Sequence, residues 1–205
     1  MVELLQSALD QAHALTAWEA CAVLLAIAYL LLAVRENILC WYCAFFSTLI
    51  YIYLFWNVSL LMESALNVYY LVMAVYGWYQ WRHGGDKKHG ASIRVLGFKK
   101  NAYCILTIAL LTLVSGWILS SSTEAAWPYV DSFTTWGSVL TTIMVARKIL
   151  ENWVYWLIID SVSIFLYIDR GLYLTALLFI AYVVIVIFGF FHWRTQLLAQ
   201  ASVSS

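Results

Sequence analysis

The segment G-W-Y-Q-W-R (residues 77–82) returns as G-F-F-H-W-R (residues 189–194) near the end of the chain. The two copies lie 112 residues apart, and at that constant offset residues 34–82 align with residues 146–194 without a gap. Apolar matches mean little in so apolar a chain, whereas the Arg, Trp, Tyr and Gly matches indicate an internal repeat. The identical pairs are Arg35/Arg147, Trp41/Trp153, Ile52/Ile164, Leu54/Leu166, Leu60/Leu172, Leu66/Leu178, Tyr70/Tyr182, Val72/Val184, Gly77/Gly189, Trp81/Trp193 and Arg82/Arg194.

The composition is that of a membrane protein, because 64% of the 205 residues are hydrophobic, 11% are charged, and the mean hydropathy is +0.84. A soluble domain needs a more polar surface, since much of its area meets water. The apolar residues form long blocks, and a block of about 18 or more can cross a hydrocarbon core of about 30 Å. We expect an all-α protein with seven transmembrane helices at residues 18–34, 38–56, 60–81, 101–120, 129–146, 152–168 and 172–193.

The repeat orders these helices as three plus one plus three. Extending the offset backwards pairs Glu19 with Asp131, so the first and fifth spans also correspond. Three helices reverse the chain and the fourth restores its direction, which predicts two parallel three-helix repeats joined by a linker helix. Parallel repeats are a transporter architecture, with substrate held near the midplane between the halves. The predicted organisation is an extracytoplasmic segment (1–17), a first bundle (18–82), a basic cytoplasmic loop with the linker helix (83–128), a second bundle (129–194) and a cytoplasmic tail (195–205).

Basic residues set the orientation. Arg35, the six Lys or Arg of residues 82–100, Arg147, Lys148 and Arg194 fall on one side of the predicted spans, and Arg170 alone falls on the other. Short basic loops stay in the cytoplasm, so the N-terminus is expected outside and the C-terminus in the cytoplasm. Because topology explains this charge, no nucleic-acid partner is expected. Glycines in the basic loop favour a flexible segment.

Polar side chains inside the spans are the candidate site, because such groups are costly in a membrane and usually face a cavity or a partner. On the sixth span, Asn152, Trp156 and Asp160 share one helical face, and the third span carries a similar stripe through Glu63, Asn67 and Tyr70. The candidate substrate-binding residues are Asn67, Tyr70, Trp156, Asp160, Asn152, Trp153, Glu63, Ser47, Thr48, Tyr182 and Asp131.

A plainer interpretation assigns some of these groups to hydrogen bonds between helices, each worth about 0.6 kcal/mol. Trp41, Trp81, Trp153 and Trp193 stand near span ends, where a Trp taken singly more often belongs to the interfacial belt. The sequence has no metal-ligand cluster and no Gly-rich phosphate loop, so neither an enzyme nor a metal or cofactor is expected. No predicted span contains a Lys, which excludes a retinal Schiff base.

The chain resembles the PnuC family of bacterial nicotinamide riboside transporters. The resemblance rests on E-S-A-L-N-V-Y-Y (63–70), Y-G-W-Y-Q-W (76–81), P-Y-V-D-S (128–132) and R-K-I-L-E-N-W-V-Y-W (147–156), in the family's order. It implies a fold similar to the sugar-transporting SWEET proteins, a homotrimer in the bacterial inner membrane, and facilitated diffusion in which cytoplasmic phosphorylation traps the substrate.

The residues themselves suit nicotinamide riboside. An aromatic cage fits its cationic ring, Asn67 or Asn152 can pair with its carboxamide, and Asp160 can accept from the ribose diol or balance the charge. A dianionic phosphate would find no Lys or Arg within the predicted lining. Thiamine or riboflavin uptake, ion-coupled transport, and a vitamin-binding subunit that needs a partner are the alternatives.

Overall fold

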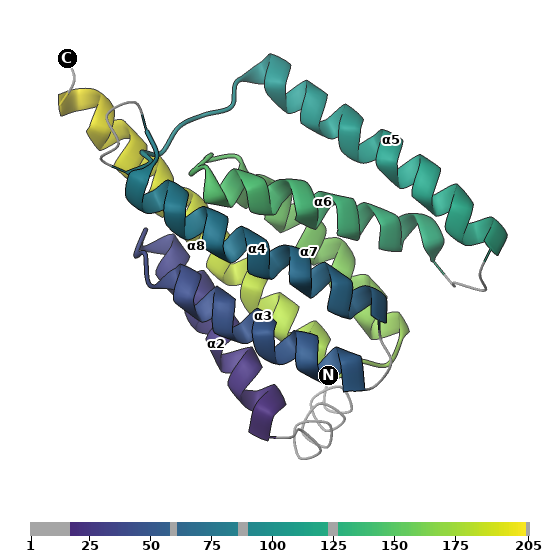
Figure 1. Cartoon of the computed structure of the whole chain (residues 1–205). Coiled ribbons are helices and arrows are strands. Elements are labelled where there is room, and N and C mark those ends of the chain that lie inside the picture. Colours follow the sequence, from purple (N-terminus) through teal and green to yellow (C-terminus); the bar gives the residue numbers. More distant parts are fainter. Residues whose placement is uncertain (1–16, 58–60, 86–89, 123–126, 204–205) are drawn as a thin grey trace.

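The computed structural model describes residues 17–57, 61–85, 90–122 and 127–203. This part of the chain is helical apart from short connections and one isolated bridge between Arg94 and Ile149 (Figure 1). The predicted N-terminal segment lies almost entirely outside the described residues. The helices are α2 (Ala17–Val34), α3 (Cys40–Asn57), α4 (Leu61–His83), α5 (Phe98–Ser122), α6 (Pro128–Ala146), α7 (Asn152–Asp169) and α8 (Tyr173–Val203).

These helices coincide with the predicted spans to within a few residues, except at the end of α8. That helix continues to Val203 instead of ending near residue 193, because Leu, Gln and Ala in residues 196–201 all favour helix. By length and composition, α2, α5 and α8 each contain a stretch long and apolar enough to cross a membrane. Because every element of the described residues is a helix, the all-helical prediction is confirmed.

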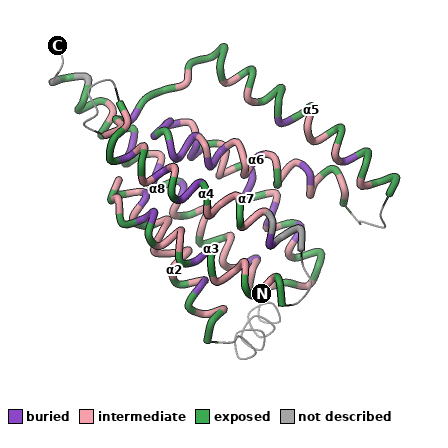
Figure 2. The backbone as a smooth tube through the Cα atoms, in the orientation of Figure 1, coloured by how far each residue is buried: buried purple, intermediate pink, exposed green. Residues whose placement is uncertain are grey.

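Six of the helices form a closed ring, and α5 lies outside it. Each helix contacts the next in the order α2, α3, α4, α6, α7, α8, and α8 packs back on α2, which closes the ring. The linker helix α5 packs on α6 at the edge of the molecule (Figure 1). Figure 2 shows most of α5 as exposed, while buried stretches gather in the ring. The two three-helix units meet where the first helix of each packs on the third helix of the other.

The sequence repeat is visible in the backbone at the end of the bundle where Arg35, Arg82, Arg147 and Arg194 lie, which we call the basic end. The turns from α2 to α3 and from α6 to α7 both contain a left-handed residue, at the equivalent positions Glu36 (φ 54°) and Lys148 (φ 50°). Few side chains adopt this conformation, so its recurrence 112 residues later marks equivalent turns.

Four tryptophans (Trp41, Trp81, Trp153 and Trp193, the Trp cluster) join the two units at the basic end. Trp41 packs edge-on against Trp81 at 5.4 Å between ring centroids, and the equivalent Trp153 and Trp193 do the same at 5.2 Å. Trp81 and Trp193 then meet across the units at 6.1 Å. The rings are at most 6% exposed, so the assignment of these residues to an interfacial belt was wrong. Pairing with one another buries rings that a single-residue argument places at the membrane surface.

Hydrogen bonds between the units follow the same repeat. The indole N–H of Trp81 donates to the Val145 carbonyl at 3.1 Å, and that of Trp193 donates to the equivalent Ala33 carbonyl at 3.1 Å. The first bond joins the C-terminal ends of α4 and α6, and the second joins the C-terminal half of α8 to the C-terminal end of α2, so each of these helix pairs runs parallel. Both units therefore point in the same direction.

An ion pair lies beside the Trp cluster. The Nζ atom of Lys148 is 2.8 Å from a carboxylate oxygen of Glu36, and it also lies 4.7 Å from the centroid of the Trp81 ring. Glu36 and Lys148 occupy equivalent positions of the repeat, as do Trp81 and Trp193. Equivalent positions touch each other only beside the axis that relates the two units. The axis of pseudo-symmetry thus passes through the basic end.

Residues 91–97, which we call the strap, lie across the basic end between α4 and α5. The Arg94 N–H donates to the Lys148 carbonyl at 3.0 Å, and the Arg94 carbonyl accepts from the Leu150 N–H at 2.9 Å. Ile93 is 3% exposed and belongs to the same buried core as the Trp cluster. The expectation of a flexible loop is therefore wrong for the strap, while Lys87 and Lys88 lie outside the described residues.

Candidate functional site

Asp160 lies near the middle of α7 and is buried, with 3% of its surface exposed. It is within electrostatic range of the Tyr70 phenol on α4 and of the Tyr182 phenol on α8. Tyr70 and Tyr182 are equivalent in the repeat, so the same side chain approaches one carboxylate from both units. The Tyr70 phenol also interacts with the Ser138 hydroxyl on α6. These four residues form the centre of the candidate site.

Three further tyrosines extend this centre. Tyr167 of α7 lies within interaction range of Tyr70 and Tyr182, Tyr51 of α3 within range of Tyr182, and Tyr29 of α2 within range of Tyr70. We call Tyr29, Tyr51, Tyr70, Tyr167 and Tyr182 the tyrosine cluster. Together with Ser138, it receives a side chain from every helix of the ring. The cluster is therefore central to the bundle.

The tyrosine cluster is less completely buried than the Trp cluster beside it. Tyr29, Tyr70 and Tyr182 each keep part of their surface accessible, unlike the four tryptophans. Tyr29 connects the two clusters, because its ring lies 5.9 Å from that of Trp41. The partly accessible tyrosine cluster thus adjoins the buried Trp cluster at the basic end.

The charged group of this site is one carboxylate, that of Asp160. The ion pairs in the described part of the chain are Lys148–Glu36 and Arg170–Asp131, and neither involves Asp160. Burying a carboxylate without a counter-charge is costly, and such a group in a membrane protein commonly marks a substrate or ion pathway. The arrangement can hold a cation among aromatic faces and hydroxyl groups.

Of the predicted site residues, Asp160, Tyr70 and Tyr182 are brought together in the structure. Asn67 lies one turn before Tyr70 on α4 and Trp156 one turn before Asp160 on α7, and both are half-buried. These positions keep both side chains on the site-facing sides of their helices.

Three further predicted residues are buried and are used in packing or in hydrogen bonds to the protein. Trp153 belongs to the Trp cluster, and Asn152 is fully buried beside it, where its amide donates to the Ile149 carbonyl at 2.6 Å. Ser47 is buried and donates to the Ala22 carbonyl of α2 at 2.8 Å, which is the role of interhelical glue.

The remaining predicted residues lie elsewhere or bond locally. The Thr48 hydroxyl donates to the Ala44 carbonyl of its own helix at 2.8 Å. Asp131 lies at the opposite end from the basic end and forms a partly exposed ion pair with Arg170. Glu63 is in the first turn of α4, and its side chain is outside the described residues.

Sequence reasoning missed Tyr29 and did not select Tyr51, Tyr167 or Ser138. A signal existed for Tyr29, because interfacial tyrosines lie near span ends and this one lies well inside α2. The Glu36–Lys148 ion pair was also missed, although the offset of 112 places these opposite charges at equivalent positions.

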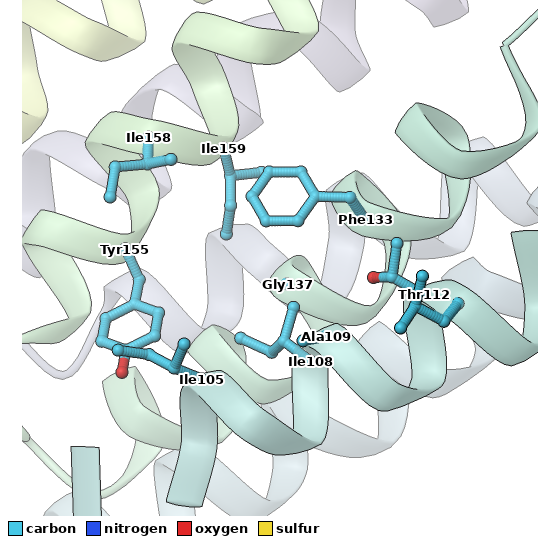
Figure 3. Close-up of a pocket in the computed structure, with 10 residues that line it drawn as sticks. Ile105, Ile108, Ala109, Thr112, Phe133, Gly137, Tyr155, Ile158 and Ile159 are labelled. Atoms are coloured by element: carbon cyan, nitrogen blue, oxygen red, sulfur yellow. The ribbon is translucent and has the colours of Figure 1, made fainter. Parts of the chain in front are cut away.

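A separate groove of about 490 Å³ lies between α5, α6 and α7, outside the ring (Figure 3). Its lining is apolar apart from the Thr112 and Tyr155 hydroxyls, with Ile105, Ile108, Phe133 and further aliphatic side chains around them. A sugar or charged ring would lose its hydrogen bonds with water there without replacing them. The groove therefore does not suit a polar substrate.

Comparisons with known proteins identify vitamin transporters that this chain is similar to. The chain is 25% identical over 173 residues to the riboflavin/roseoflavin transporter RibM of Streptomyces davaonensis, which covers 83% of this chain and 81% of the relative. It is 26% identical over 165 residues to the nicotinamide riboside transporter PnuC of Escherichia coli, covering 68% of this chain and 69% of the relative.

A crystal structure of the vitamin B3 transporter PnuC superposes with a TM-score of 0.69, covering 95% of this chain and 90% of the other at 18% identity. That similarity establishes the fold. The model of the nicotinamide mononucleotide transporter family matches residues 16–195, which is most of the chain. The protein is therefore a multi-pass membrane transporter, and it belongs to the nicotinamide mononucleotide transporter (PnuC) family.

Proposed function

We propose that this transporter takes up nicotinamide riboside by facilitated diffusion across the bacterial inner membrane, with phosphorylation in the cytoplasm trapping the substrate. The observation that carries the proposal is Asp160, a buried carboxylate among tyrosines that belongs to neither ion pair of the described residues. A permanently cationic pyridinium ring supplies the missing counter-charge, and the tyrosine faces stabilise the cation.

The rest of the substrate fits neighbouring groups. Asn67 pairs with the carboxamide, Trp156 stacks on the ring, and the phenols of Tyr70 and Tyr182 bond the ribose hydroxyls. The 5′-phosphate form is rejected, because a dianion beside Asp160 is repelled and meets no basic partner there. The proposed substrate is thus the nucleoside rather than the mononucleotide of the family's name.

In the proposed topology, the seven helices all span the membrane as two parallel units joined by α5, similar to the SWEET arrangement. The basic end faces the cytoplasm and the N-terminus lies outside. The chain assembles as a homotrimer, which light scattering of the detergent-solubilised protein tests directly.

Alternating access fits the placement of the contacts between the units. At the basic end, the indole bonds of Trp81 and Trp193, the Glu36–Lys148 pair, and a 3.1 Å bond from the Arg147 Nε to the Tyr76 hydroxyl all join one unit to the other. A net contribution of about 1 kcal/mol for each hydrogen bond allows the units to separate there in a transport cycle. Rocking of the units around Asp160 would then open the site to the cytoplasm.

Counterflow in liposomes tests the substrate. Purified protein with unlabelled nicotinamide riboside inside is expected to accumulate labelled nicotinamide riboside, and not its 5′-phosphate. Asp160→Asn is expected to weaken the apparent affinity about 10- to 100-fold, the effect of losing a hydrogen-bonded charge pair. Asp169→Asn is the matched control, because Asp169 is an exposed carboxylate that accepts a 2.8 Å bond from the Trp127 indole. Unchanged affinity in Asp160→Asn would move the site elsewhere.

Riboflavin is the second candidate substrate, since the Streptomyces relative aligns with more of this chain than the Escherichia coli relative does. Riboflavin is neutral, so its transport is expected to survive Asp160→Asn, and counterflow with both vitamins separates the two. A protonophore or sodium ionophore that lowers uptake would favour ion coupling. Binding without any equilibration would instead indicate a binding subunit that needs a partner.

A further inference from the structure

The Glu151 carboxylate, just before α7, holds the strap to the second three-helix unit. Both of its oxygens accept from the Leu96 N–H, at 2.9 and 3.0 Å, and one also accepts from the Asn101 amide at 3.1 Å. Asn101 lies in the first turns of α5, and its side-chain oxygen lies 3.2 Å from the Tyr155 hydroxyl of α7. One carboxylate therefore ties the end of the strap and the start of α5 to α7.

Among the residues that the structure describes, the first unit has no counterpart of this connection. The position equivalent to Glu151 is Leu39, which is 53% exposed and carries no acceptor. The strap also pairs with the second unit through its backbone, at Lys148 and Leu150. Its contact with the first unit is slighter, a 3.2 Å bond from the Ala91 N–H to the Gln80 carbonyl. The strap is thus built into the second unit and rests against the first.

The strap inserts Ile93 into the core that both units share. That core contains Trp81 and Cys40 from the first unit and Trp193 from the second. Separation of the units at this end breaks the core between α4 and the strap, because the strap has more hydrogen bonds to the turn between α6 and α7 than to α4. Ile93 would then leave the core with the second unit.

We propose that Glu151 is a positioning residue for the transport cycle: it fixes the strap to the second unit, so that Ile93 closes the cytoplasmic end when the units come together. This inference rests on the proposed function, because it needs units that move. The carboxylate touches no substrate and acts through the strap. Without it, the strap is held to the second unit only by its backbone pairing with Lys148 and Leu150, and the closed cytoplasmic end loses stability relative to the open one.

The native Cys40 thiol is a reporter of this closure. It is fully buried in the shared core, so it reacts with a thiol reagent only when the cytoplasmic end opens. In a chain whose other cysteines are replaced by alanine, labelling of Cys40 by a maleimide is measured from the cytoplasmic side of sealed vesicles. Glu151→Leu, which copies the first unit's Leu39, is expected to label about tenfold faster, the effect of one charge-assisted hydrogen bond on an equilibrium.

Two variants separate positioning from damage to the fold. Glu151→Gln keeps an oxygen that accepts from the Leu96 N–H, so labelling is expected to return close to the wild-type rate. Asp169→Leu removes a carboxylate acceptor at the opposite end and is expected to leave Cys40 labelling unchanged. Equal labelling in wild type and Glu151→Leu, or acceleration in Glu151→Leu that only parallels a loss of thermal stability and is not rescued by Gln, would overturn the proposal.

The transport assay keeps the two proposals apart. Failure of the wild-type protein to equilibrate any of the vitamins overturns the proposed function, whatever the labelling shows. Wild-type transport together with unchanged labelling and unchanged transport in Glu151→Leu overturns the role of Glu151 alone. The expected result is an altered transport rate in Glu151→Leu with an equilibrium substrate affinity within about twofold of wild type, because Asp160 and its neighbours are intact.

Discussion

Breaking the Glu36–Lys148 ion pair is expected to loosen the two units where their pseudo-symmetry axis passes. The perturbation is a cycle of Glu36→Gln, Lys148→Gln and the double variant. Gln has nearly the shape of Glu and, like it, lacks branching at Cβ, so the left-handed φ of 54° at position 36 carries no added strain. The cycle therefore reports mainly on charge.

The structure sets the expected size. The two charged atoms are 2.8 Å apart, and the side chains are only 11% and 18% exposed. At an effective dielectric constant of about 20, the direct attraction at that separation is roughly 6 kcal/mol, most of which is offset by desolvation of both ions. We expect each single variant to lower the free energy of unfolding by about 2–3 kcal/mol and the coupling energy to be about 2 kcal/mol. Lys148→Gln also removes the contact with the Trp81 ring, worth about 1 kcal/mol more.

The assay is denaturant or thermal unfolding in one detergent, followed by tryptophan fluorescence. The double variant is expected to be less destabilised than the sum of the single variants by the coupling energy. A charge swap, Glu36→Lys with Lys148→Glu, is expected to recover only part of the loss, because a carboxylate then faces the Trp81 ring. Strict additivity of the two Gln variants, or full recovery in the swap, would refute this account of the pair.

Two further changes test the packing around these features. Gly189→Ala places a methyl group 2.7 Å from the Trp153 ring, which must shift, so we expect a loss of about 1–3 kcal/mol in the free energy of unfolding; the equivalent Gly77→Ala meets the Trp41 ring and is expected to cost a similar amount. Wild-type stability in either variant would show that the Trp cluster is loosely packed. Asp131→Asn removes an ion pair whose side chains are 30% and 41% exposed, so less than about 1 kcal/mol is expected by the same unfolding measurement. A large loss of substrate affinity in that variant would return Asp131 to the binding site.

The fold was predictable because long apolar blocks and the repeat each carry a direct physical signal. Helical spacing also identified the face of α7 that carries Asp160, and Tyr70 and Tyr182 were both among the predicted site residues. What spacing does not reveal is which non-consecutive helices touch. The packing of α2 on α8 and of α4 on α6 is set by side-chain fit between distant segments, and it decides which polar residues meet.

The errors have the same origin. Trp41 and Trp193 were assigned to the membrane surface because each was considered alone, whereas their burial comes from partners in the other helices. The hydrogen bond from Ser47 to the Ala22 carbonyl is likewise a tertiary contact that helical spacing does not reveal. The strap was expected to be flexible because the basic loop contains glycines. Its own sequence does not show that Glu151, which is distant in the chain, will bind it.

The opposite charges of Glu36 and Lys148 also bear on how the two halves of the chain recognise each other. Across the pseudo-symmetry axis, two copies of the first half would bring Glu36 against Glu36, and two copies of the second half would bring Lys148 against Lys148. Like charges at this spacing repel, so only one half of each kind forms an attractive pair. An assembly of two identical halves therefore cannot form this ion pair, whereas a chain that contains both halves can. The ion pair therefore forms only because the two halves of the repeat carry opposite charges at this position. Separately expressed halves are expected to associate with each other and not with themselves.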